Sequence, residues 1–430
     1  MTDNPKGVTN VTTDQNKTIA LTSVYQAHER LKDIVTHTPL MSNLNLSTQF
    51  SANILLKRED LQVVRSYKVR GAYNKMCGLA PEELSNGVVC ASAGNHAQGV
   101  AYACRKLSVP GIIFMPITTP NQKVKQVRMF GKEYVEVVLT GDTFDDSYKA
   151  ASEYCTSHNK HFIHPFNDLQ VMAGQGTVGL EILSDAEEPI DYLVLPIGGG
   201  GLASGVGSVF QHLSPHTKII GVEPAGAPAM YESIQKGYPV TLDEIDKFVD
   251  GAAVKRVGDL TFEICRPILD RVILVPEGKV CSTILQLYNE EAIVVEPAGA
   301  LSIAALDFLK DEIKGKNVVC IVSGSNNDIT RTEEIKERSL LYEGLKHYFL
   351  IRFAQRAGAL REFLVDVLGP QDDIAHFEYS KKNSREKGPA LVGIELQNRE
   401  DFAGLIQRMQ DKKITYEYLN DRQDLLQYLL

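Results

Sequence analysis

The chain has 430 residues, a formal net charge of −9 and a pI near 5.7. This acidic balance argues against binding to nucleic acid or to an anionic membrane surface, because proteins with those partners carry a basic excess. Hydrophobic residues make up 43% of the chain and charged residues 23%, as in ordinary globular proteins, and the length predicts two or three folding units.

The cysteines and the N-terminal segment indicate a cellular compartment. No two of the seven cysteines are spaced as C-x-x-C, and several lie within apolar runs such as 88–91 and 318–322. They are predicted to be buried free thiols in a reducing environment. Residues 1–18 are polar, so a disordered tail without a signal peptide is expected, and no apolar run is as long as a membrane span. We therefore expect a cytoplasmic protein.

From residue 22 to about residue 327 the chain alternates short apolar runs with stretches of helical spacing. Helices are predicted over 22–34, 96–107, 119–130 and 204–213. Strands are predicted over 53–56, 88–91, 112–115, 134–139, 162–164, 192–197, 218–222, 272–275 and 318–322. Most of these runs are continuously apolar, as in strands that are covered on both faces. The pattern predicts an α/β fold with mostly parallel sheets in two lobes.

The C-terminal part of the chain has a different pattern. Residues 333–345 form a charged helical stretch that is predicted to be a linker. Residues 346–430 follow the order strand, helix, strand, strand, helix, strand, over 348–353, 359–368, 374–379, 391–396, 401–409 and 415–419. This is the βαββαβ order of a ferredoxin-like unit, with a polar hairpin tip at 381–388. It carries no catalytic set and is predicted to be a binding module.

The first motif with chemical potential is Ser66-Tyr67-Lys68-Val69-Arg70-Gly71. Lys68 follows a strand-like run and lies near the start of a predicted helix. The partial positive charge of a helix N-terminus disfavours an ammonium group there, and a neutral amine is what Schiff-base chemistry requires. Taken alone, however, the motif is more typical of a solvated surface lysine.

Two further motifs each follow a predicted strand and precede a helix or a turn. In the segment 92–99, Ser92-Ala93-Gly94-Asn95-His96 opens a helix, and its unpaired N–H groups are suited to an anion such as a carboxylate. Ordinary helix capping by Ser92 or Asn95 explains the same residues equally well. The segment 323–328 begins with Ser323 at the carboxyl end of a strand, where ligands lie in open α/β sheets.

The glycine run 198–201 also lies between a strand and a helix. Four consecutive glycines are costly to order, which favours a backbone that closes around a phosphate at a helix N-terminus. The spacing of Gly198, Gly200 and Ala203 also fits the dinucleotide fingerprint, with Glu223 near the ribose-binding position. The spacing by itself leaves phosphate and pyrophosphate as alternatives.

Taken in order, the four motifs resemble the fold-type II pyridoxal phosphate family, the tryptophan synthase β-like enzymes, and within it the serine/threonine dehydratases. The family patterns S-[FY]-K-x-R-G, S-x-G-N-H-x-Q-G, G-G-G-G-L and S-G-x-N are met at 66–71, 92–99, 198–202 and 323–326. The resemblance covers about residues 20–330 and implies a two-lobed catalytic domain over 19–332. Residues 346–430 resemble the ACT-like regulatory domain of biosynthetic threonine dehydratases through 352–363, where Ala357 replaces the usual proline.

The resemblance implies pyridoxal 5'-phosphate as the cofactor and a role for each motif. Lys68 would hold the cofactor covalently and act as the base at the substrate Cα. Further cofactor contacts would come from Asn95, Gly198, Gly199, Gly200, Gly201, Leu202 and Ser323. The substrate carboxylate would bind at Ser92, Ala93, Gly94, Asn95 and His96. A hydroxyl group facing the pyridine nitrogen would make the ring a weaker electron sink, which favours β-elimination over transamination.

The implied reaction is the conversion of L-threonine, with L-serine as a secondary substrate, to a 2-oxo acid and ammonia at the entry to isoleucine biosynthesis. Isoleucine or valine would act as an effector at the C-terminal domain of a homotetramer or dimer. No metal is expected, because Ala229 stands where the metal site of serine racemases requires an acid. A serine dehydratase, a serine racemase and a threonine synthase remain alternatives of the same fold. An NAD-dependent dehydrogenase or a non-catalytic amino-acid sensor remain alternatives of other classes.

Overall fold

The structure, a computed structural model, describes residues 18–379 and 387–422 and divides into two compact units. The first unit contains the chain up to Leu274 together with Leu301–Asn326. The second contains Val275–Ala300 and the chain from Asn327 onward. Within the described ranges, no helix is long and apolar enough to cross a membrane. The finer domain boundaries expected from the sequence stay a prediction.

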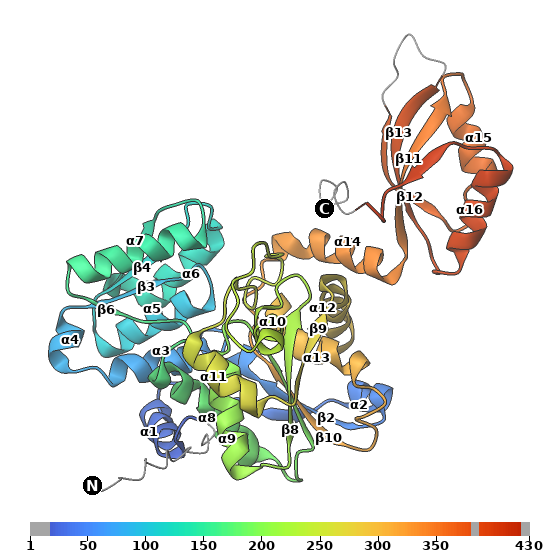
Figure 1. The fold of residues 1–430 in the computed structure, drawn as a ribbon. Helices are drawn as coiled ribbons and strands as arrows, with labels where there is room; N and C mark the ends of the chain where they lie inside the picture. The colour runs from blue at the N-terminus through green and yellow to red at the C-terminus, as the bar shows by residue number, and fades with distance from the viewer. Residues whose placement is uncertain (1–17, 380–386, 423–430) are drawn as a thin grey trace, which may run out of the picture. The chain divides into compact units, whose positions relative to one another are not determined.

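The smaller sheet of the first unit has four parallel strands in the order β5-β4-β3-β6. These strands are β3 (Val88–Ala91), β4 (Gly111–Met115), β5 (Val135–Leu139) and β6 (His161–Phe162). Figure 1 shows α7 (Phe144–Ser157) on one face of this sheet, with α5 (Asn95–Leu107) and α6 (Asn121–Gly131) on the other. Alternate side chains of β3 enter two different apolar clusters, because successive strand residues point to opposite faces. This double burial explains the continuously apolar strand sequences.

The larger sheet of the first unit has six strands in the order β1-β2-β10-β7-β8-β9. The strands are β1 (Leu40–Ser42), β2 (Asn53–Arg58), β7 (Tyr192–Pro196), β8 (Lys218–Pro224), β9 (Arg271–Val275) and β10 (Asn317–Val322). β1 runs antiparallel to β2, whereas β2, β10, β7 and β8 are parallel. One apolar cluster joins this sheet to α8 (Leu169–Asp185), α9 (Gly201–Leu213) and α11 (Asp259–Ile268).

Further helices and 3₁₀ turns lie along the chain outside these sheets. The helices are α1 (Leu21–Leu31), α2 (Leu44–Phe50), α3 (Lys68–Cys77), α4 (Pro81–Ser85), α10 (Ala229–Lys236) and α13 (Pro297–Ala304). The 3₁₀ turns are η1 (Glu59–Leu61), η2 (Lys132–Tyr134), η3 (Ala305–Phe308) and η4 (Ile329–Arg331).

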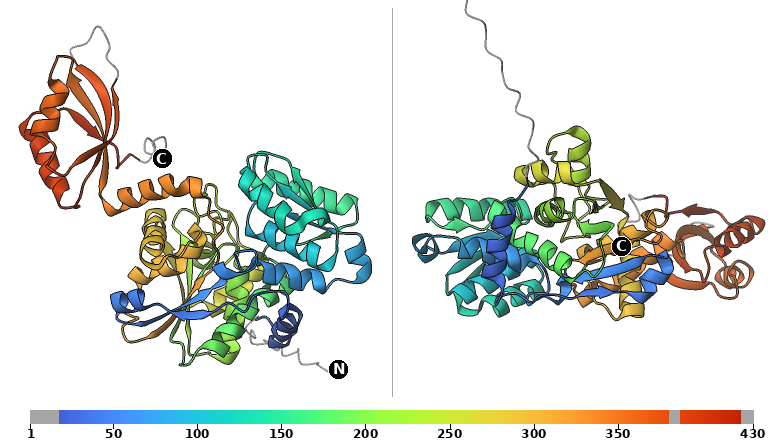
Figure 2. Two further views of the ribbon diagram at one scale, coloured as in Figure 1. Left: turned by 180° about the vertical axis from the view of Figure 1, so that it is seen from behind. Right: turned by 90° about the horizontal axis from the view of Figure 1, so that it is seen from below.

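In the second unit, α12 (Glu277–Glu291) packs against α14 (Thr332–Glu343). A four-stranded antiparallel sheet follows in the order β12-β13-β11-β14. Its strands are β11 (Lys346–Ala354), β12 (Asp373–Tyr379), β13 (Lys387–Glu395) and β14 (Tyr416–Tyr418). Helices α15 (Ala359–Asp366) and α16 (Asp401–Asp411) lie together on one face of this sheet (Figures 1 and 2).

The predicted fold class is confirmed. The first unit is α/β with mostly parallel sheets, and the C-terminal strand order is that of a βαββαβ ferredoxin-like unit. Most of the predicted hairpin tip at 381–388 lies outside the described residues.

Candidate active site

Lys68 is the first residue of α3, close to where the sequence places it. Its Nζ donates a hydrogen bond to the carbonyl oxygen of Pro165 at 3.1 Å and lies 5.3 Å from the centroid of the Tyr67 ring. Helix α5 passes directly beside it, since a Cβ added to Gly99 would lie 3.1 Å from the Lys68 carbonyl carbon. The amine is therefore held at a helix N-terminus by neighbouring backbone.

The loop that begins with Ser323 lies next to Lys68. The Tyr67 N–H donates to the Ser323 carbonyl at 3.3 Å, and Ser66 forms an isolated antiparallel bridge with Gly324. Ser323 is only 2% exposed, at the carboxyl end of β10. The Ser66 hydroxyl is buried and has no hydrogen-bond partner among the described residues. The first and fourth sequence motifs thus come together.

The segment 92–96 joins the same region from the other sheet. Ser92, Ala93 and Gly94 connect β3 to α5, and the Gly94 N–H donates to the Ser92 hydroxyl at 3.2 Å. Asn95 begins α5, and its Oδ1 accepts a hydrogen bond from Asn326 at 2.6 Å. This contact ties the second motif to the fourth, as convergence on one ligand requires.

His96 is buried beside Lys68. Its Nε2 donates to the carbonyl oxygen of Ile163 at 2.8 Å, while its Nδ1 is buried without a hydrogen-bond partner among the described residues. Burial, followed by the positive charge of Lys68, lowers the pKa of His96 to about 3. His96 is therefore neutral at physiological pH, and its free ring nitrogen is an acceptor.

The glycine run 198–201 adopts a conformation that other residues would strain. Gly200 has a φ of +91°. A Cβ on Gly199 would lie 2.3 Å from the ring of Phe166, and a Cβ on Gly201 would lie 2.9 Å from the Phe166 Cβ. The hydroxyl of Thr261 donates to the Gly199 carbonyl at 2.6 Å. The glycines therefore allow an aromatic ring to pack directly on this backbone.

The two ends of this loop are also tightly packed. A Cβ on Gly198 would lie 3.0 Å from the backbone of Ala252, and Leu202 is buried in the apolar cluster that joins the six-stranded sheet to α8, α9 and α11. The loop precedes α9, so the first N–H groups of that helix have no partner within the helix itself. A phosphate is a suitable acceptor for such groups.

Glu223 has a structural role here. It is fully buried, and its two carboxyl oxygens accept from the backbone N–H groups of Met230 at 2.7 Å and Tyr231 at 2.8 Å. Burial raises its pKa to about 8, against these two hydrogen bonds. Because both oxygens are engaged at the start of α10, this carboxyl group is not placed to bind a ribose. The dinucleotide interpretation of the glycine loop therefore lacks the acidic residue that it requires to bind the ribose.

One segment that the sequence analysis did not single out connects the motifs. Residues 163–168 follow β6, and within them Pro165 accepts from Lys68 while Phe166 packs on the glycine loop. The signal that could have found it is the run His164-Pro165-Phe166 directly after a short strand, because ligands in open α/β sheets lie beyond the carboxyl ends of the strands.

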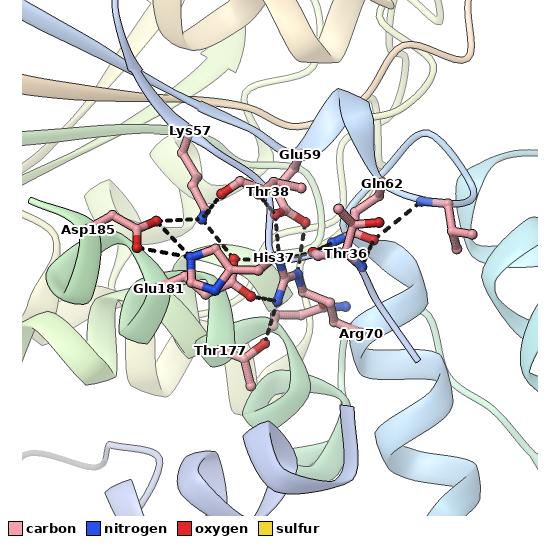
Figure 3. A network of polar contacts seen from close by, with 12 residues as sticks. Thr36, His37, Thr38, Lys57, Glu59, Gln62, Arg70, Thr177, Glu181 and Asp185 are labelled. Atoms are coloured by element: carbon pink, nitrogen blue, oxygen red, sulfur yellow. Dashed lines mark hydrogen bonds and ion pairs between the residues drawn. The ribbon is translucent and has the colours of Figure 1, made fainter. Parts of the chain in front are cut away.

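A buried charge network holds α3 in place (Figure 3). Arg70, two residues after Lys68, is fully buried and forms ion pairs with Glu59 at 2.7 Å and Glu181 at 2.6 Å. Lys57, also fully buried, pairs with Glu181 at 2.7 Å. Burial alone would lower the pKa of Arg70, but the two carboxylates raise it above its usual value. The network joins α3 to η1 and α8.

These residues fit pyridoxal phosphate. A lysine amine suits an aldehyde, and the glycine backbone before α9 suits a phosphate. Buried polar atoms without a hydrogen-bond partner among the described residues, on Ser66, His96 and Asn326, remain for polar substituents of a bound molecule.

Fold and site together define a pyridoxal-phosphate-dependent enzyme. The family model described as pyridoxal-phosphate dependent enzyme matches residues 31–324, and the model described as the C-terminal regulatory domain of threonine dehydratase matches residues 337–429. The chain is 60% identical over 412 residues to the biosynthetic L-threonine dehydratase IlvA of Halalkalibacterium halodurans, covering 96% of this chain and 99% of that protein. It is 59% identical to the Bacillus subtilis protein of the same name, covering 97% and 99%.

Solved structures show the same relationship. Threonine deaminase isoform 2 from Solanum lycopersicum matches with a TM-score of 0.70 and 39% identity, over 78% of this chain and 99% of that one. Serine racemase from Dictyostelium discoideum matches with a TM-score of 0.67 and 33% identity, over 73% and 100%. The chain belongs to the family of biosynthetic L-threonine dehydratases.

Gly199→Ala should weaken binding of pyridoxal phosphate by about tenfold or more, since the added methyl group must displace either the Phe166 ring or the loop. Equilibrium titration of protein freed of cofactor measures this change. Gly404→Ala in α16 is the matched control, because its methyl group would meet only the flexible end of the Arg408 side chain. Unchanged affinity of the Gly199 variant would show that the loop does not contact the cofactor.

Cofactor-free protein should lose stability as the pH falls from about 6.5 to about 4.5. Burial and Lys68 lower the pKa of His164 to about 4 and that of His96 to about 3, below the value of an unfolded histidine. Over this pH range the unfolded state therefore binds more protons than the folded state. The stability that is present at higher pH is lost as the pH falls. Urea unfolding measures the free energy of unfolding of the wild type and of His164→Asn. The value for the wild type minus that for the variant should fall by about 1 kcal/mol for each unit by which the pH is lowered. A difference independent of pH would contradict a neutral, buried His164.

Proposed function

We propose that the protein converts L-threonine to 2-oxobutanoate and ammonia, the committed step of isoleucine biosynthesis, with L-serine as a slower substrate. One observation carries the proposal. The Lys68 amine bonds Pro165, whose neighbour Phe166 packs on the glycine loop, and Tyr67 bonds the Ser323 loop, in a chain that matches relatives named threonine dehydratases along nearly its whole length.

Each loop has a role in this reaction. Pyridoxal phosphate, when bound, supplies the electron sink that stabilises negative charge at the substrate Cα. Lys68 holds the cofactor and takes the Cα proton. Its position beside Pro165, next to the residue that packs on the glycine loop, supports this role. The backbone N–H groups of Gly198, Gly199, Gly200, Gly201 and Leu202 hold the phosphate. Asn95 binds the ring hydroxyl oxygen, and Ser323 faces the ring nitrogen.

The segment 92–96 binds the substrate carboxylate. Ser92, Ala93, Gly94, Asn95 and His96 lie at the N-terminus of α5, whose N–H groups and dipole favour an anion. His96 is neutral and hydrogen-bonded to backbone, so we assign it to shaping this loop. Its lowered pKa makes His96 a weak base, which leaves the Lys68 amine as the base.

We infer that the C-terminal unit binds an amino-acid effector, isoleucine or valine, and that the enzyme is a homotetramer. The match to a C-terminal regulatory domain supports the first inference. Within that unit, Glu337 of α14 accepts from the Tyr348 hydroxyl at 2.7 Å and pairs with Lys346 on β11. Because α14 also packs on α12, a change in the sheet can reach α12 through α14.

We also place the protein in the cytoplasm. All seven cysteines are free, and six of them are buried. This is the pattern expected in a reducing compartment, where structural disulfides are rare.

The test is the initial rate of 2-oxo acid formation from L-threonine and L-serine, with pyridoxal phosphate present and isoleucine added in increasing amounts. Turnover of threonine that isoleucine suppresses supports the reaction and the effector together. If neither isoleucine nor valine changes the rate, the result supports the reaction and excludes both amino acids as effectors. Racemisation of serine without threonine turnover would replace the dehydratase with the racemase alternative.

A further inference from the structure

The turn that carries Pro165 and Phe166 is built by the side chain of His164. Its Nδ1 accepts hydrogen bonds from the backbone N–H groups of Phe166 at 3.2 Å and Asn167 at 2.9 Å. An acceptor on the δ position of residue i that bonds the N–H of residue i+2 reproduces the geometry of an Asx turn. Nδ1 must be unprotonated to accept both bonds, and burial, followed by Lys68, lowers the pKa of His164 to about 4.

This turn contacts both ends of the cofactor site. On one side, the Pro165 carbonyl accepts from the Lys68 Nζ at 3.1 Å. On the other side, the Phe166 ring occupies the space that a Cβ on Gly199 would need, and the Cβ and backbone of Phe166 occupy the space that a Cβ on Gly201 would need. Residues 165 and 166 are adjacent, so their positions cannot change independently of each other.

Asn167 provides a second connection to the glycine loop. Its Oδ1 accepts from the Leu260 N–H at 3.0 Å and would lie 2.4 Å from a Cβ on Gly258. The Gly258 N–H in turn donates to the Gly199 carbonyl at 3.4 Å. The His164 turn therefore meets the glycine loop directly through Phe166 and indirectly through Asn167.

We propose that His164 is a positioning residue that sets the Lys68 amine relative to the glycine loop that binds the cofactor phosphate. A ligand anchored at two points binds tightly only when the two anchors are held at the matching separation. His164 fixes the separation of the two anchors, Lys68 and the glycine loop, through the turn. Its own ring nitrogens contact neither of them. The proposal builds on the cofactor roles of Lys68 and the glycine loop, and it is independent of which amino acid is the substrate.

The alternative is that the ring only fills space, since it also packs against Phe162 and Tyr148 and lies edge-on to Phe166 with centroids 4.8 Å apart. His164→Asn and His164→Leu separate the two roles. Both variants remove the ring and have side chains with the same branching at Cγ and the same number of heavy atoms, but only asparagine keeps an acceptor at the δ position. A difference between them that appears with one ligand and not with another therefore reports on the acceptor.

The experiment titrates each full-length variant, freed of cofactor, with pyridoxal phosphate and with pyridoxal, which lacks the phosphate. We expect His164→Leu to bind pyridoxal phosphate about tenfold or more weakly than His164→Asn, because two partly buried N–H groups lose their acceptor. The two variants should bind pyridoxal equally, because that ligand has no phosphate to reach the glycine loop. Equal affinity of the two variants for pyridoxal phosphate would overturn the proposal.

An equal difference between the variants with both ligands would also overturn it, since that result indicates a general defect at Lys68. Should His164→Leu not fold, His164→Gln takes its place, because glutamine keeps the amide but moves the acceptor one bond too far for the turn. The readout is cofactor affinity, so it stands whether or not the enzyme acts on threonine.

Discussion

Lys68→Ala should lower the rate of 2-oxo acid formation from L-threonine by about 10²–10⁴-fold or more. The substitution removes the group that we assign both to holding the cofactor and to taking the Cα proton. The contacts that it breaks include a hydrogen bond to a backbone carbonyl and a contact with the Tyr67 ring, and α3 keeps its buried Arg70 network, so the fold should persist. Initial rates under saturating pyridoxal phosphate, together with the thermal midpoint, measure the two effects separately.

Lys125→Ala is the matched control, because Lys125 is an exposed lysine on α6. It should keep the wild-type rate. Partial recovery of the Lys68 variant by a small added primary amine would support the assignment of the base. A Lys68 variant with more than about a tenth of the wild-type rate would exclude Lys68 as the base.

Arg70→Met should lower the free energy of unfolding by about 3–5 kcal/mol, because it leaves Glu59 buried without its cationic partner and leaves Glu181 with Lys57 alone. Desolvation makes an isolated buried carboxylate very unfavourable, and in this network the guanidinium of Arg70 pairs with both carboxylates (Figure 3). Denaturant unfolding of the cofactor-loaded protein measures the loss.

Arg256→Met is the control for a charge pair outside the core. Arg256 and Asp259 form a 2.6 Å ion pair whose side chains are 42% and 66% exposed. Its loss should cost no more than about 1 kcal/mol. The double variant Arg70→Met with Glu59→Gln should be less destabilised than the sum of its single variants, since the second change removes a charge that the first leaves unpaired. Strict additivity would mean that the two groups do not interact.

The local elements of this protein are largely determined by local sequence. Strands covered on both faces have continuously apolar sequences, and β3 has the predicted bounds for that reason. The short strand β1 (Leu40–Ser42) was not predicted, because only three residues are involved and no periodicity can show in them. The site loops were found because glycine runs and helix starts after strands are local features.

Only the tertiary structure determines how these loops meet and what holds them there. Asn95 and Asn326 are hydrogen-bonded although 231 residues separate them, and Lys68 reaches a carbonyl 97 residues away. Arg70 was part of a predicted motif, but its partner Glu181 lies 111 residues further along. The pattern of apolar and polar residues indicates which face of a helix or strand is buried. It does not indicate which distant helix or strand will pack against that face, and the contacts named above form between such distant elements. The sequence therefore determined the candidate site residues, and the packing of the sheets and helices determined their common site, its buried ion network and the turn at His164.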